Sequence, residues 1–203
     1  MKFENVAENV VMFKYKTRFE KDFPYYLIKH KNGNFLIGCP EELTEEVSKK
    51  INEIGGINFI FISHRDDIGC VSMYKRKYNA KIIIHKSEAK FISDCEVDIP
   101  FTSDTLIVEN VEAIHTPGHT PGNSCLYFKD YGFLFTGDQI CVNEAGEPFV
   151  YLIKHGTDNE KISDQEVDEI LNSLKEKNFT KIFSLFGMVL ENAKERLMTQ
   201  QIS

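Results

Sequence analysis

The stretch His115-Thr-Pro-Gly-His119-Thr-Pro-Gly-Asn-Ser124, with Tyr131-Gly-Phe-Leu-Phe-Thr-Gly-Asp138 after it, decides the fold of this chain. Pro-Gly pairs are typical of turns, so the first segment predicts a loop that presents a histidine. The second segment predicts a short apolar strand that ends in Gly-Asp. Imidazole and carboxylate are both common metal ligands. These two segments therefore present a histidine, His119, in a loop and an aspartate, Asp138, at a strand end, and both are residue types that can bind a metal.

A second polar segment, Phe61-Ile-Ser-His64-Arg-Asp-Asp67-Ile-Gly69, lies upstream. It follows the nearly continuous apolar run 57–62, which predicts a strand buried on both faces. The polar residues therefore lie at the C-terminal end of that strand. His64, Asp66 and Asp67 are thus polar residues placed together just after a buried strand.

The remaining patterns predict an α/β (α+β) chain. Asn32-Gly33 favours a tight hairpin between strands 25–29 and 35–38. Apolar residues at helical spacing predict a helix over 41–54, which Gly55-Gly56 ends. Each half runs from strands to helix, strand and helix, which predicts two similar layers placed back to back. The other predicted helices are 73–78, 86–92, 164–177 with Ser163 or Asp164 as its cap, and 191–198; the other predicted strands are 81–85, 106–108, 111–114, 125–128, 133–136 and 181–185.

Composition limits the possible partners. A length of 203 residues with 42% hydrophobic residues predicts one domain, 1–203, with a sizeable core. The formal net charge of −7 argues against nucleic acid or an anionic membrane as a partner. The first residues lack a signal-peptide pattern and no apolar run is long enough for a membrane span, so we expect a cytoplasmic protein.

The cysteines predict free thiols. There are five of them, scattered and without a Cys-x-x-Cys pair, so neither a disulfide framework nor a structural zinc site is expected. Cys39, Cys70 and Cys141 lie near predicted strand ends or site segments, where a thiolate could act as a soft ligand. Small buried hydrophobic residues are the favoured interpretation.

The two motif segments resemble the metallo-β-lactamase superfamily, in order and over nearly the whole chain. The resemblance implies a four-layer αβ/βα sandwich with the site along one edge of two facing sheets. It also implies that His119 is a ligand of the first metal and that Asp138 is the aspartate that bridges two metals. The Ser-His-Arg-Asp-Asp segment at 63–67 looks like that of a divergent branch of the superfamily.

The chain departs from the family's His-x-His-x-Asp-His signature. In one register Ile62 replaces the first histidine, His64 matches the second, Asp66 matches the aspartate and Asp67 replaces the third histidine. In a shifted register His64 is the first histidine and Asp66 stands where the second belongs. We favour the former. The family's last histidine is replaced too, because Leu185-Phe-Gly-Met188 puts methionine there. The resemblance therefore implies a degenerate site with at most one well-formed metal.

The surviving residues suit one divalent cation, zinc or iron. His64, Asp66 or Asp67, His119 and Asp138 would hold it, and the metal would lower the pKa of a bound water to about 7. Asp66 would orient that water or take its proton. The resemblance thus implies hydrolysis of an ester, thioester, lactone or phosphoester in a small-molecule substrate. If the carboxylates converge without a cation, at least one of their pKa values must rise.

Two alternatives stay open. In the first, the protein is metal-free and catalytically inactive, and binds an anionic small molecule or regulates through the same cleft. Arg65 would then be the substrate-binding residue, or would turn inward to the place of the missing ion; otherwise it is a surface residue or a local salt bridge. In the second, a carboxylate-rich shell holds iron for redox chemistry. A homo-oligomer also stays open.

Three other features need a role. We expect His115 to shape the Thr-Pro-Gly turns by hydrogen bonding. His155 is a candidate replacement ligand. The loop 139–163 contains the apolar run 149–153, which suits a lid or a binding wall, or else a core strand or a dimer contact.

Overall fold

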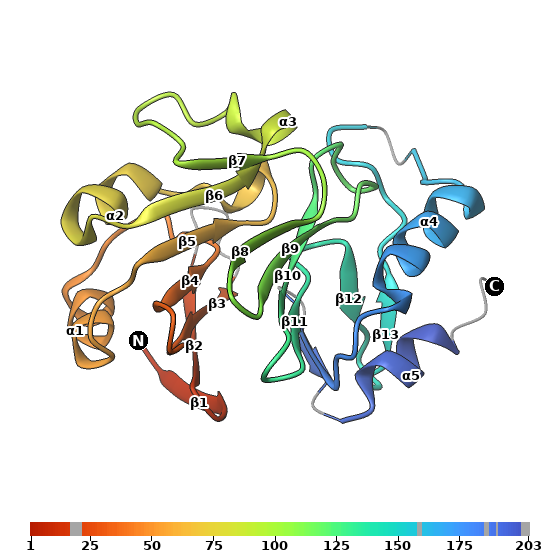
Figure 1. The fold of residues 1–203 in the computed structure, drawn as a ribbon, viewed down its shortest axis with the longest axis horizontal. Helices are drawn as coiled ribbons and strands as arrows, with labels where there is room; N and C mark the ends of the chain where they lie inside the picture. The colour runs from red at the N-terminus through yellow and green to blue at the C-terminus, as the bar shows by residue number, and fades with distance from the viewer. Residues whose placement is uncertain (17–21, 158–159, 185–186, 190, 200–203) are drawn as a thin grey trace. The chain divides into compact units, whose positions relative to one another are not determined.

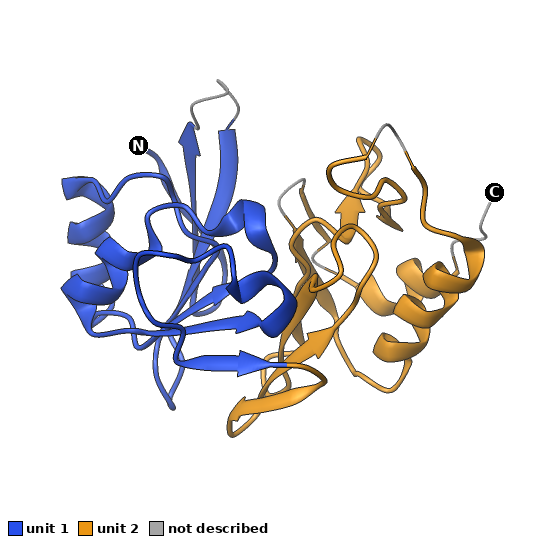
Figure 2. Cartoon of the chain, turned by 90° about the horizontal axis from the view of Figure 1, so that it is seen from above, with its two compact units in different colours: residues 1–101 blue, residues 102–203 orange. Residues whose placement is uncertain are grey.

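The computed structural model describes residues 1–203 apart from 17–21, 158–159, 185–186, 190 and 200–203. The chain divides into two compact units, Met1–Phe101 and Thr102–Ser203 (Figure 2). Each unit is built on its own sheet. The prediction that residues 1–203 form a single domain stays a prediction.

In the described part of the first unit, seven strands form one mixed sheet in the order of the sequence (Figure 1). The pairs from β1 to β4 are antiparallel, and β4, β5, β6 and β7 pair in parallel. The hairpin around Gly33 is confirmed, and this glycine has a φ of 122°. The strands are β1 (Phe3–Ala7), β2 (Val10–Lys16), β3 (Asp22–Ile28), β4 (Phe35–Ile37), β5 (Phe59–Ile62), β6 (Lys81–His85) and β7 (Ile99–Phe101).

The helices of this unit are α1 (Glu45–Glu53), α2 (Val71–Tyr78) and α3 (Lys86–Ala89), with a 3-10 turn, η1 (Arg65–Asp67). The predicted start of the first helix at residue 41 is wrong. The Thr44 hydroxyl accepts a hydrogen bond from the backbone N–H of Val47, so Thr44 is the N-cap. The apolar spacing could not locate this cap.

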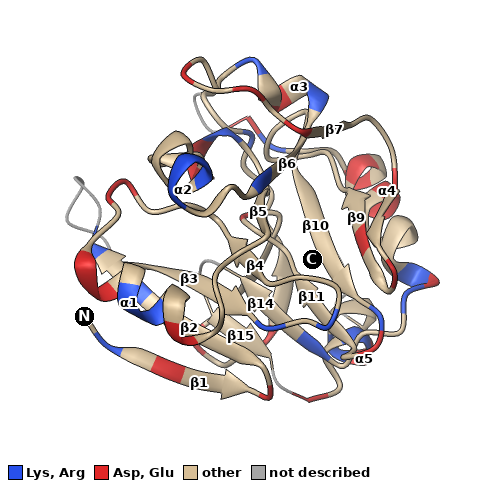
Figure 3. Ribbon diagram, turned by 60° about the vertical axis from the view of Figure 1, so that its left-hand side comes forward, with Lys and Arg blue, Asp and Glu red and all other residues tan. Residues whose placement is uncertain are grey.

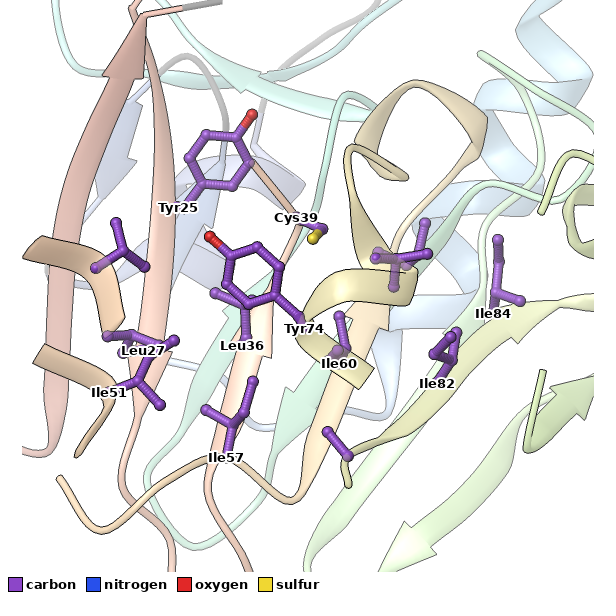
Figure 4. Close-up of a cluster of buried hydrophobic side chains, with 14 of the residues drawn as sticks. Tyr25, Leu27, Leu36, Cys39, Ile51, Ile57, Ile60, Tyr74, Ile82 and Ile84 are labelled. Atoms are coloured by element: carbon purple, nitrogen blue, oxygen red, sulfur yellow. The ribbon is translucent and has the colours of Figure 1, made fainter. Parts of the chain in front are cut away.

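A buried apolar cluster forms the core of the first unit (Figure 4). It contains residues of β5 and β6 together with Ile51 of α1 and Tyr74 of α2. Burying each large aliphatic side chain contributes about 1.5–3 kcal/mol. Ile62, the last residue of β5, is fully buried and belongs to this cluster.

In the second unit, six of the described strands form a sheet in the order β15-β14-β11-β10-β9-β8. Its strands are β8 (Thr105–Val108), β9 (Val111–His115), β10 (Ser124–Phe128), β11 (Phe133–Phe135), β14 (Lys181–Ser184) and β15 (Gly187–Val189). Only the β11 and β14 pair is parallel among these described strands. The predicted strand end at Leu185 lies outside the described residues.

The helices α4 (Asp164–Lys175) and α5 (Ala193–Met198) complete the second unit. Ser163 caps α4 and forms a capping box with Glu166, which confirms the predicted start. Charged residues follow the helix dipole in α1 and α4, with acidic residues in the first turn and lysine in the last (Figure 3). None of the helices in the described part of the chain is long and apolar enough to cross a membrane.

The predicted long loop after Asp138 contains a small sheet. Strands β12 (Ile140–Val142) and β13 (Pro148–Val150) pair in antiparallel fashion. Val150 packs in a small buried cluster with Ile162, Val167 and Ile170. Part of the apolar run therefore forms a core strand, one of the two predicted alternatives.

Gly69 provides a test of how the polar segment is seated on β4. Its φ is 48°, and a Cβ atom there would lie 2.0 Å from the backbone oxygen of Cys39. Gly56 has a φ of 86° but nothing lies within 4 Å of its Cβ position. We expect Gly69→Ala to cost at least ~3 kcal/mol of unfolding free energy, because backbone must move. Gly56→Ala should cost about 1 kcal/mol, because only the φ strain applies. Urea unfolding of both variants makes the comparison, and equal losses would contradict it.

Candidate functional site

His64 follows β5 and is fully buried, and its two ring nitrogens face different groups. Its Nε2 lies 3.5 Å from Asp66 Oδ2. Its Nδ1 lies 2.9 Å from Ser63 Oγ and 3.4 Å from Asp67 Oδ2. The imidazole is thus held at Nδ1 while Nε2 is directed toward Asp66.

The two consecutive aspartates have different surroundings. Asp67 is 6% exposed and accepts a short hydrogen bond from the Ser63 hydroxyl. The backbone N–H of Cys39 donates to Asp67 O over 2.9 Å, which seats the turn on the end of β4. The Asp66 side chain is 47% exposed. Asp67 is therefore placed to orient His64, as the carboxylate does in carboxylate–histidine–metal arrangements. Asp66 is accessible and lies on the Nε2 side of the ring.

Arg65 makes a bidentate salt bridge with Glu88 of α3. Its Nε lies 2.7 Å from Glu88 Oε2 and its Nη2 lies 2.9 Å from Glu88 Oε1. The Arg65 backbone N–H also donates to Glu88, and the guanidinium lies 4.2 Å from the ring centroid of Phe91. The hydrogen bond to Glu88 raises the pKa of Arg65. Of the predicted interpretations of Arg65, the structure shows the local salt bridge. Its role in ligand binding stays a prediction.

His119 occupies the loop between β9 and β10 in the second unit and is 8% exposed. Its Nδ1 lies 2.8 Å from the backbone oxygen of Ile153. A carbonyl can only accept, so Nδ1 carries the proton and the neutral ring keeps its lone pair on Nε2. That Nε2 lies 3.8 Å from Asp138 Oδ2. The sequence-predicted pair is brought together.

The loop around His119 is fixed by hydrogen bonds. His115 Nε2 donates to the backbone oxygen of Pro121 over 3.0 Å, which confirms the turn-shaping role predicted for it. The His119 backbone N–H donates to Gln139 Oε1 over 2.8 Å. A Cβ at Gly118 would lie 2.6 Å from that same oxygen, so a larger residue there would require the Gln139 side chain to shift.

His155 lies near His119. Its backbone N–H donates to the backbone oxygen of His119 over 2.7 Å, and the two ring centroids are 5.6 Å apart. The ring of Tyr151 is also 5.6 Å from that of His119. Met188 lies in β15, paired with Phe183, and offers a thioether where the resemblance expects imidazole.

The structure therefore brings together His64, Asp66 and Asp67 in the first unit, and His119 and Asp138 in the second. That the two groups form one site stays a prediction. Sequence reasoning missed Ser63, Glu88 and Gln139, which position these residues. Ser63 adjoins the motif and Gln139 follows Asp138, so both gave a local signal, whereas Glu88 is separated from Arg65 by 23 positions.

Mixed sheets with helices, and polar side chains gathered where strands end, define an α/β fold with a candidate site. The family model of the metallo-beta-lactamase superfamily matches residues 24–176. This chain belongs to that superfamily. The predicted αβ/βα sandwich fold class is confirmed by this match and by the solved structures with the same fold.

Two curated relatives illustrate the range of sequence similarity. The uncharacterized protein YmaE of Bacillus subtilis is 26% identical over 210 residues, which cover 98% of this chain and 76% of YmaE. The hydroxyacylglutathione hydrolase of Pelagibacter ubique is 33% identical over 88 residues, which cover 42% of this chain and 36% of that enzyme.

Solved structures share the fold at lower identity. The DIM-1 metallo-beta-lactamase has a TM-score of 0.71 at 14% identity, with 98% of this chain and 97% of that chain covered. FIM-1 from Pseudomonas aeruginosa, in its mono-zinc form, has a TM-score of 0.68 at 14% identity and covers 96% and 93%. TTHA1623, in a di-iron-bound form, has a TM-score of 0.65 at 16% identity and covers 86% and 92%.

The salt bridge between Arg65 and Glu88 gives a stability prediction. Glu88 is fully buried, so its carboxylate depends on the guanidinium for compensation. In a double-mutant cycle of Arg65→Ala and Glu88→Ala, followed by urea unfolding, we expect a coupling energy of about 2 kcal/mol or more.

The control is the exposed pair Lys50 and Glu53, whose side chains are 27% and 49% exposed. Its coupling energy should be about 0.3–0.5 kcal/mol. A coupling between Arg65 and Glu88 no larger than this would show that the turn is not held by the pair.

Proposed function

We propose that this protein is a metal-dependent hydrolase that holds one divalent cation. The observation that carries the proposal is the shared presentation of His64 and His119. Each is held at Nδ1 by a neighbour and directs Nε2 toward a carboxylate. Imidazole nitrogen beside carboxylate oxygen is the donor set that zinc and iron take in proteins.

The residues assigned to the cation are His64, Asp66, His119 and Asp138. Membership of the superfamily supports bringing the two pairs to one ion. In this proposal Asp67 orients His64 from its Nδ1 side. A single ion is favoured because Ile62 lies in the core and Met188 offers only a thioether. Family structures with one zinc and with two irons make either metal reasonable.

The bound cation would act as a Lewis acid and lower the pKa of a nearby water to about 7. Residues of the chain would then accept the proton and orient the ligands. Asp66, whose side chain is accessible, would accept the proton of the attacking water. Ser63 and Asp67 keep His64 in one tautomer and orientation, and Ile153 and Gln139 do so for the ring and the backbone of His119.

A carboxylic ester or thioester is the substrate class that we favour. Two relatives are hydroxyacylglutathione hydrolases, although the matches cover only 36% and 55% of those enzymes. Arg65 does not favour the anion-binding alternative, because its Nε and Nη2 are bonded to Glu88.

Metal content is the first test. We expect about one zinc or iron per purified chain, and less than about a tenth of that in His119→Ala, because its Nε2 would be lost. His115→Gln is the matched control, since His115 is part of the same loop but bonds to Pro121. Elemental analysis measures all three proteins. No metal in the unchanged protein would overturn the proposal and favour a metal-free binding protein, and iron with redox activity but no hydrolysis would favour the redox alternative.

Hydrolysis is the second test. The metal-loaded protein should cleave members of a panel of esters, thioesters, lactones and phosphoesters, and a chelator should abolish the activity. Asp66→Asn should lower kcat/KM by about 10²- to 10⁴-fold, because proton transfer is lost. Glu53→Gln, on the exposed surface of α1, should leave the rate unchanged. An Asp66→Asn variant with full activity would remove Asp66 from the mechanism.

A further inference from the structure

Two backbone hydrogen bonds place Cys39 and Cys70 beside one another in the first unit. The N–H of Cys39 donates to Asp67 O over 2.9 Å, and the N–H of Cys70 donates to Pro40 O over 2.9 Å. Both cysteines pack in the apolar cluster of this unit. Two backbone hydrogen bonds therefore join the residues that follow β4 to the segment that leads into α2.

The two cysteines share a backbone acceptor and differ in accessibility. The Cys39 thiol donates to the backbone oxygen of Pro40 over 3.7 Å, and the same oxygen accepts from the Cys70 N–H. Cys39 is 1% exposed and belongs to the same buried cluster as Tyr74 (Figure 4). Cys70 is half-buried, at the N-cap of α2. An outside reagent can therefore reach Cys70 before Cys39.

We propose that Cys39 and Cys70 form a reversible disulfide that covalently ties the segment bearing His64, Asp66 and Asp67 to the end of β4. The two backbone hydrogen bonds and the shared acceptor Pro40 O place the two cysteines side by side, which is the placement that a disulfide requires. As support, the neighbouring Cys39 thiol lowers the pKa of Cys70, while burial raises the pKa of Cys39.

The remaining cysteines are less suited to this reaction. Cys125 and Cys141 are buried, and burial raises the pKa of each thiol to about 12. Cys95 is half-buried, and burial raises its thiol pKa as well. Among the five cysteines, all of them described, Cys70 alone has a lowered thiol pKa.

The chemistry needs a small-molecule disulfide, such as oxidised glutathione, as oxidant. The Cys70 thiolate attacks one sulfur of the reagent, forms a mixed disulfide and releases one reagent thiolate. Cys39 then loses its proton and attacks the Cys70 sulfur, which releases the second thiolate. The protein loses two protons and two electrons, and the reagent is reduced to two thiols. Excess reduced thiol reverses both steps.

The bond would act on the polar segment without adding or removing any candidate ligand. It closes a loop that includes α1, β5 and η1, so it restricts the opening of the segment after β5. The inference does not depend on the proposed hydrolase function. The disulfide can form whether or not the protein binds metal.

The test uses the full chain treated with oxidised glutathione and then blocked, digested and analysed by mass spectrometry. We expect a peptide containing Cys39 linked to one containing Cys70, and three of the five thiols still titratable in denaturant. The melting temperature should rise by about 5–10 °C and return after reduction. Cys39→Ala and Cys70→Ser should abolish the linkage and the shift, and Cys95→Ser should keep both.

Three results would overturn the inference. They are five titratable thiols after treatment, glutathione retained on Cys70 without transfer to Cys39, and a linkage to another cysteine. Because the peptide map is made on the unchanged protein, it remains decisive if a variant of Cys39 fails to fold.

Discussion

The parallel pairing of β4, β5 and β6 is the constraint on which the chemistry of the first unit depends. Parallel strands end at the same sheet edge, so the residues that follow them come out side by side. Cys39 follows β4, His64 follows β5 and Glu88 follows β6. Their mutual contacts with Arg65, Asp67 and Cys70 are consequences of that shared edge. Segments far apart in sequence thereby build one polar cluster above an apolar core.

In each unit the Nδ1 atom of a histidine is held by a neighbour, but the neighbour is of a different kind. A histidine that is to offer Nε2 must have Nδ1 occupied, or the ring can change tautomer and rotate. In the first unit side chains do this, because Ser63 and Asp67 lie at Nδ1 of His64. In the second unit backbone does it, because the Ile153 carbonyl holds Nδ1 of His119. The long segment after Asp138 is thus a support for His119 as well as a strand-forming region.

Sequence reasoning succeeded where the signal was local. Strand β6 was predicted with its observed bounds, and Ser163 was predicted as a cap, because apolar runs and capping residues act within a few positions. Strands β1 and β2 were missed. Glu88 could not be assigned to Arg65, since their contact depends on the parallel register that places Ile62 opposite Ile84. The different roles of Asp66 and Asp67 were also undetermined, because consecutive residues of a 3-10 turn point in different directions.

The burial of Ile62 bears on how the polar segment corresponds to the family signature. Ile62 packs with Ile60, Ile82 and Ile84 in the core of the first unit, on the face that the helices cover. A residue with that orientation cannot supply a ligand at the edge of the sheet, and an imidazole there would be buried among aliphatic side chains. His64 is the first residue after β5 whose ring meets carboxylates. This geometry is an argument for the shifted register, in which His64 takes the place of the first histidine, against the register that we favour from the sequence alone; both stay predictions. In that register Asp66, two residues after His64, stands where the second histidine belongs, so a carboxylate replaces an imidazole there.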